Sequence, residues 1–88
     1  YILADNCSTD GSGDIARLAA AADERFKYLR FSERLSQGDN YNRVLRLISP
    51  SSRFCKIVQA DDYILARCLE VMTGLGRRYP SAGVISAM

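Results

Sequence analysis

Ile57-Val58-Gln59-Ala60-Asp61-Asp62 is the stretch that decides the fold. A short apolar run that ends in two adjacent carboxylates is typical of a buried parallel strand, and open α/β sheets bind their ligands outside such strand ends. Two neighbouring acids repel each other unless a positive group lies beside them. A divalent cation that also holds phosphate oxygens is the usual solution, because hard cations take oxygen ligands. The alternative is that Asp61 caps the next helix and Asp62 is a solvated surface acid.

Strand and helix patterns alternate along the chain on both sides of this stretch. Short apolar runs predict strands, and they lie at residues 1–4, 26–31, 54–58 and 83–88. Apolar residues at helical spacing predict the helices between them, at Ile15, Leu18, Ala19 and Ala22, at Tyr41, Val44, Leu45 and Ile48, and at Leu65, Leu69 and Met72. Gly74 and Gly76 are expected to weaken the last helix. Connections of this length predict a partial doubly wound, mainly parallel α/β sheet with helices on both faces.

Composition excludes several classes of protein. The 88 residues are 48% apolar and 25% charged, as in a soluble globular protein. The net charge of +2 comes from scattered arginines without a dense basic stripe, which argues against nucleic-acid binding. No apolar run has the length of a membrane span. Because the chain starts at Tyr1 and ends in an apolar run, we expect residues 1–88 to be an internal part of a single larger domain.

The sulfur and imidazole content limits the chemistry further. Three cysteines without C-x-x-C spacing favour a reducing compartment over a disulfide framework or zinc site, and they are Cys7, Cys55 and Cys68. We therefore expect a cytoplasmic protein, in solution or at the cytoplasmic face of a membrane. Histidine is absent, which excludes Ser-His-Asp and Cys-His mechanisms within these residues. Acid–base or metal chemistry must then rest on carboxylates.

A second polar loop follows the first predicted strand. Asp5 and Asn6 offer acceptors and an amide donor suited to a base edge or to ribose hydroxyls. Parallel strands have their carboxyl ends on one rim, so this loop and the Asp61-Asp62 loop are expected to face one crevice. The structural alternative is that the loop contains only turn and capping residues.

Three features together resemble the family 2 glycosyltransferases. Asp5-Asn6-Cys7-Ser8-Thr9-Asp10-Gly11-Ser12 after a strand resembles the second-strand signature of that family. Ala60-Asp61-Asp62 after a later strand resembles its diacid motif. Gly38 and Asn42 are similar to the glycine and asparagine positions between the two motifs. The resemblance covers nearly the whole chain.

The resemblance implies a nucleotide-sugar-dependent glycosyltransferase with the Rossmann-like GT-A fold, here the donor-binding half without its first strand. It implies that Asp5, Asn6, Asn42 and Asp61 bind the donor, and that Asp62 binds Mg²⁺ or Mn²⁺. Asp61 and Asp62 would be the catalytic acids within these residues, and the catalytic base would lie outside them. The acceptor is an unknown saccharide, lipid or protein.

Three departures from the family pattern leave the donor open. Gln59 stands where many members have an acid, Ala66 where many have a proline, and Asn6 where many have a second aspartate. Two alternatives also remain. One is a non-catalytic domain that binds a sugar nucleotide or a protein. The other is a piece of a P-loop ATPase in which Asp61-Asp62 is the Walker B acid pair.

Overall fold

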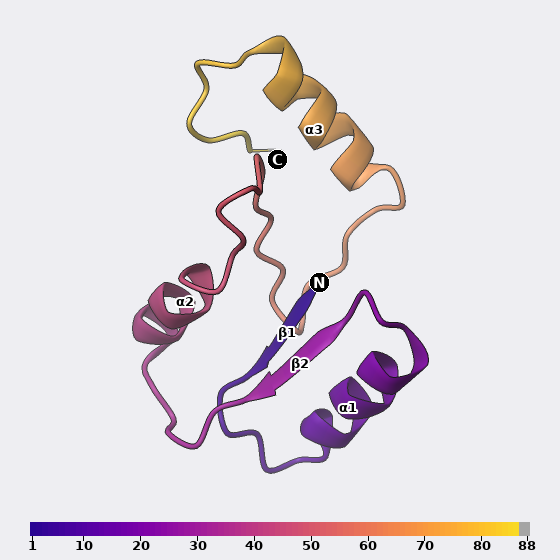
Figure 1. Ribbon diagram of the computed structural model, residues 1–88, viewed down its shortest axis with the longest axis vertical. Helices are drawn as coiled ribbons and strands as arrows, with labels where there is room; N and C mark the ends of the chain where they lie inside the picture. The colour runs from indigo at the N-terminus through magenta and orange to yellow at the C-terminus, as the bar shows by residue number, and fades with distance from the viewer. Residues whose placement is uncertain (87–88) are drawn as a thin grey trace. The chain divides into compact units, whose positions relative to one another are not determined.

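The computed structural model describes residues 1–86. Its elements in chain order are β1 (Ile2–Asp5), α1 (Ser12–Ala22), β2 (Lys27–Arg30), α2 (Gln37–Leu45) and α3 (Cys68–Arg78) (Figure 1). They fall into two units, residues 1–48 and the residues from 49 onward, which are described separately.

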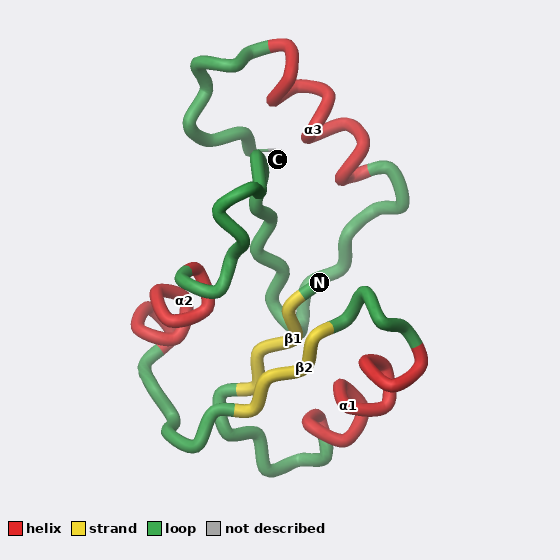
Figure 2. Tube along the Cα trace, viewed as in Figure 1, coloured by secondary structure: helices red, strands yellow, loops and turns green. Residues whose placement is uncertain are grey.

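The first unit is built on a two-stranded parallel sheet (Figure 2). β1 and β2 pair in a register that runs from Ile2 opposite Lys27 to Asp5 opposite Arg30. The Phe31 N–H extends the ladder by donating to the Asp5 carbonyl over 3.0 Å. The parallel direction predicted for these two strands is therefore confirmed, and α1 is the connection that a parallel pair requires.

α1 lies against this sheet through its smallest residues. Gly13 is buried, and Ala16, Ala19 and Ala20 are half-buried. The two large residues of the apolar stripe that predicted the helix are not part of this contact, since Ile15 and Leu18 are 72% and 70% exposed. Small side chains let the helix backbone come close to β2, and the larger ones are left on the outer surface of this unit.

α2 begins earlier than the spacing of apolar residues predicts. The Ser36 hydroxyl accepts a bond from the Asp39 N–H and donates one to the Asp39 carboxylate, which fixes the start of the helix at Gln37. This exchange resembles a capping box, in which side chains satisfy the open donors of the first turn. Ile48, expected in this helix, lies beyond its end at Leu45.

The second unit contains α3, which continues through both of the glycines expected to weaken it. Gly76 is buried under the Phe54 ring, and a side chain at this position would overlap the ring. The absence of a Cβ therefore serves close packing here, and this contact offsets the low helix propensity of glycine.

Two predicted strands are wrong in this structure. Residues 54–58 and 83–86 form no strand, and the rest of the last prediction, residues 87 and 88, lies outside the described residues. A strand is defined by hydrogen bonds to a neighbouring strand, and within residues 1–86 β1 and β2 pair only with each other. The structure is therefore α/β with a small parallel sheet, and the doubly wound arrangement stays a prediction.

Hydrophobic burial is small throughout the described residues. No apolar side chain among them is buried, whereas Asp5 is only 8% exposed. The longest helices of residues 1–86 have 11 residues. No helix in this part of the chain has the length and hydropathy of a membrane span.

Candidate functional site

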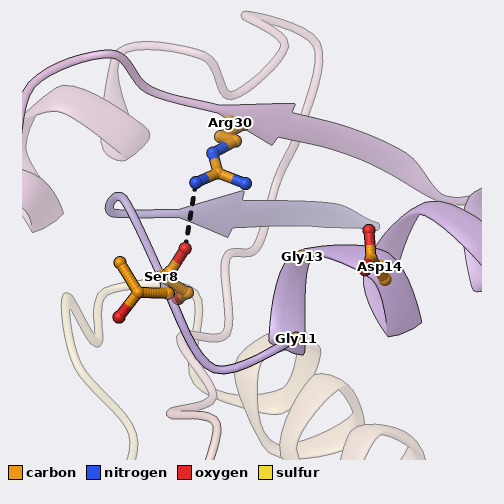
Figure 3. A pocket seen from close by; sticks show the side chains of 6 residues that line it. Ser8, Gly11, Gly13, Asp14 and Arg30 are labelled. Carbon is orange, nitrogen blue, oxygen red and sulfur yellow. Dashed lines mark hydrogen bonds between the residues drawn. The ribbon is translucent and has the colours of Figure 1, made fainter.

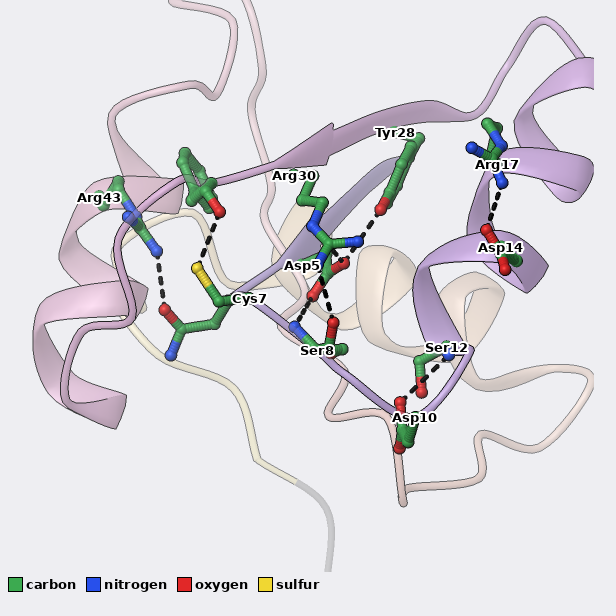
Figure 4. A network of polar contacts seen from close by, with 12 residues as sticks. Asp5, Cys7, Ser8, Asp10, Ser12, Asp14, Arg17, Tyr28, Arg30 and Arg43 are labelled. Atoms are coloured by element: carbon green, nitrogen blue, oxygen red, sulfur yellow. Dashed lines mark hydrogen bonds and ion pairs between the residues drawn. The ribbon is translucent and has the colours of Figure 1, made fainter.

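Asp5 is the centre of a cluster of polar contacts in the first unit (Figure 4). It ends β1, and its Oδ1 accepts a hydrogen bond from the Ser8 N–H over 2.7 Å. Its Oδ2 accepts one from the Tyr28 hydroxyl over 2.9 Å and lies 4.0 Å from the Arg30 Nε. Sequence reasoning selected Asp5, but it did not find its partners on β2.

These contacts keep the carboxylate charged. Hydrogen bonds from Ser8 are the largest cause that lowers the pKa of Asp5, and Tyr28 and Arg30 act in the same direction against the effect of burial. Burial is the main cause that raises the pKa of Tyr28, and the bond to Asp5 adds to it. At neutral pH the pair is therefore a phenol that donates to a carboxylate.

Gly13 makes this arrangement possible. A Cβ at this position would lie 2.6 Å from the Tyr28 Oη and 2.9 Å from the Asp5 Oδ2, closer than side-chain atoms pack. Gly11 has a different role, because its φ of 84° places the residue before α1 in the left-handed region that favours glycine. The sequence shows a glycine near the start of the helix, but not which atoms it must leave room for.

Asn6 joins the β1 loop to the loop that precedes α2. Its Oδ1 accepts bonds from the Leu35 N–H over 3.0 Å and from the Arg43 Nη2 over 2.9 Å, and its Nδ2 donates to the Leu35 carbonyl over 2.8 Å. The next residue, Cys7, has a φ of 65° and donates its S–H to the Phe31 carbonyl over 2.9 Å. Hydrogen bonds from Asn6 and Cys7 therefore connect this loop to the segment after β2 and to α2.

Arg43 is a site residue that sequence reasoning missed. Its guanidinium carbon lies 3.4 Å from the centre of the Phe31 ring, and its side chain also donates to the Glu33 carbonyl and to the Asn40 side chain. The predicted donor residue Asn42 is its exposed neighbour on α2. The spacing of Asn40 and Arg43 on one helix was the only signal for this contact, and it does not reveal the link to Asn6.

A shallow pocket lies where the β1 loop meets the start of α1 (Figure 3). Its lining consists of Ser8, Thr9, Gly11, Gly13, Asp14 and Arg30. The Arg30 guanidinium donates to the Ser8 carbonyl over 3.0 Å across this pocket. The pocket therefore combines a cation with the amino end of a helix, and Asp14 partly offsets that positive charge.

Asp61 and Asp62 lie in the second unit, in an exposed turn that the Asp62 N–H closes by donating to the Gln59 carbonyl over 3.1 Å. Residues 54–58, which directly precede this turn, form no strand. Residues 1–86 contain no cluster of three or more histidine, cysteine or acidic side chains that could enclose a metal ion. Two adjacent carboxylates nevertheless fit Mg²⁺ chemistry, because this ion is usually held by one or two carboxylates together with substrate phosphates.

Comparison with known proteins identifies the family. The sequence model of "Glycosyl transferase family 2" matches residues 1–88. The chain belongs to glycosyl transferase family 2. No curated protein and no solved structure matches it. Family membership confirms the resemblance found in the two motifs and supports a GT-A-like α/β fold, and the P-loop ATPase interpretation finds no support.

Proposed function

We propose that this glycosyltransferase family 2 protein transfers a sugar from a nucleoside-diphosphate donor, and that the loop after β1 forms part of its donor site. The observation that carries the proposal is the family match over residues 1–88. The charged, hydrogen-bonded Asp5 at the end of β1 supports it, because a fixed acceptor suits the N–H of a base or the hydroxyls of a ribose.

The contacts within the protein determine what this loop can still offer a ligand. A carboxylate oxygen can accept more than one hydrogen bond, so Asp5 retains acceptor capacity beyond the bonds from Ser8 and Tyr28. Both lone pairs of the Asn6 Oδ1 are used, and among residues 1–86 its amide donates one N–H, to the Leu35 carbonyl, which leaves the other for a ligand. Asn42 is exposed on α2 and, together with Asp61, completes the proposed donor-binding set.

We assign the ribose and the metal-bound diphosphate of the donor to Asp61 and Asp62. Asp61 would bind the ribose and Asp62 would be the ligand of Mg²⁺ or Mn²⁺. A divalent cation bound there supplies positive charge for the diphosphate that leaves as the glycosidic bond breaks. Both side chains are exposed in their unit, as this role requires. The base that activates the acceptor is expected outside residues 1–88, and the acceptor is a saccharide, a lipid or a protein.

Calorimetric titration of the full-length protein with ADP, CDP, GDP, UDP and dTDP, each with Mn²⁺ and with EDTA, tests the proposal. We expect at least one of these nucleotides to bind, and to bind more tightly with Mn²⁺. Glu24→Gln changes an exposed acid away from the loop and is the control that should leave binding unchanged. Absence of binding by every nucleotide would overturn the donor site.

A further inference from the structure

One arginine connects the separate segments around the proposed donor loop. The Arg43 Nη2 donates to the Asn6 Oδ1 over 2.9 Å (Figure 4). The same nitrogen donates to the Asn40 Oδ1 over 2.6 Å. Its Nη1 donates to the Glu33 carbonyl over 3.1 Å, and the guanidinium lies over the Phe31 ring. The β1 loop, the end of β2 and α2 thus meet at a single side chain.

Hydrophobic packing does little to hold α2 in place. None of its nine residues is buried, and Leu45 is 41% exposed. Polar contacts to the neighbouring loops must therefore fix the position of this helix within the first unit. Arg43 makes those contacts from the last turn of the helix, next to Asn42.

The orientation of the Arg43 side chain is set by its partners, although not every N–H of its guanidinium is hydrogen-bonded. The Arg43 Nε is buried and has no hydrogen-bond partner among the described residues. An unpaired buried N–H is unfavourable, so the other bonds and the ring contact must impose this orientation. Two of them, to Asn6 and to Glu33, connect α2 with segments that precede it in the chain.

We propose that Arg43 is a positioning residue for donor binding, acting through Asn6. The inference rests on the proposed function. Arg43 orients the Asn6 amide and so holds the β1 loop in one conformation before the nucleotide arrives. A loop that is already ordered loses less conformational entropy on binding, which increases affinity. Lysine cannot replace it, because only the planar guanidinium can stack on a ring and donate in several directions at once.

The test measures nucleotide affinity in the full-length protein. The probes are ADP, CDP, GDP, UDP and dTDP with Mn²⁺, and the tightest ligand of the unmodified protein is used throughout. We expect Arg43→Met and Arg43→Lys each to weaken its binding roughly tenfold, the order expected when hydrogen bonds to a charged group are removed. Arg46→Met, at an exposed arginine just after the same helix, is the matched control and should bind normally.

A double-mutant cycle separates positioning from general stability. If Arg43 acts through Asn6, Arg43→Met should weaken binding far less in an Asn6→Ala background than alone. Unchanged affinity in both Arg43 variants, or fully additive losses in the double variant, would overturn the inference. If Arg43→Met does not fold, the cycle is made with Arg43→Lys, which keeps the charge. Failure of the unmodified protein to bind any of the nucleotides would overturn the proposed function, and this inference with it.

Discussion

Gly13→Ala tests the arrangement around Asp5 most directly. The new Cβ would lie 2.6 Å from the Tyr28 Oη and 2.9 Å from the Asp5 Oδ2, so at least one of these groups must move. Overpacking of this kind costs about 1–3 kcal/mol. Loss of the hydrogen bond from the Tyr28 hydroxyl to the charged Asp5 carboxylate costs a further ~1.5–3 kcal/mol. The higher helix propensity of alanine offsets about 1 kcal/mol of this loss. We expect a net loss of about 1.5–5 kcal/mol in the free energy of unfolding.

A second glycine provides a matched control. Gly38 occupies the second position of α2 as Gly13 does in α1, and nothing lies within 4 Å of a Cβ built there. Gly38→Ala should therefore be neutral or stabilise by up to about 1 kcal/mol. Urea unfolding of the full-length protein, followed by circular dichroism, measures both variants. Gly13→Ala in a Tyr28→Phe background should recover part of the loss, since the nearest contact atom is then absent. Equal effects of the two glycine substitutions would refute the reasoning.

Four further predictions concern the site and the stability of the chain. Asp62→Ala should abolish Mn²⁺-dependent turnover of the full-length enzyme, and unchanged metal dependence would exclude Asp62 as the ligand. Asp5→Asn should weaken nucleotide binding and leave metal affinity intact. Because the folded-state pKa of Asp5 is lowered, its charge stabilises the fold above the unfolded pKa of about 3.9, and this contribution is lost as the pH falls through the lower folded value. The free energy of unfolding of Asp5→Asn should therefore fall less steeply than that of the unmodified protein as the pH is lowered through this range. An identical dependence of the unfolding free energy on pH in the two proteins would contradict this. The polypeptide of residues 1–88 by itself should associate or lack a cooperative melt, since no apolar side chain of residues 1–86 is buried. A monomer that melts cooperatively by circular dichroism and sedimentation would show that this expectation is wrong.

Local patterns were enough to predict the elements whose signals lie close together in sequence. The spacing of Ile15 and Leu18 predicted α1, and the aromatic run at residues 26–31 predicted β2. The polar loop after β1 and the acids at Asp61 and Asp62 resemble a family signature, and the match over residues 1–88 confirmed the family itself. Helix periodicity and turn chemistry depend on neighbours in sequence, which is why a single sequence reveals them.

Only the tertiary structure decided which side chains meet. The apolar run at residues 54–58 forms no strand, because a strand depends on a partner that no local pattern supplies. The same dependence on distant residues explains why Gly13 must lack a side chain beneath Tyr28, and why Arg43 holds Asn6. Residues far apart in sequence make these contacts, and their geometry is set by the pairing of β1 with β2 and the placement of α1 and α2 around them.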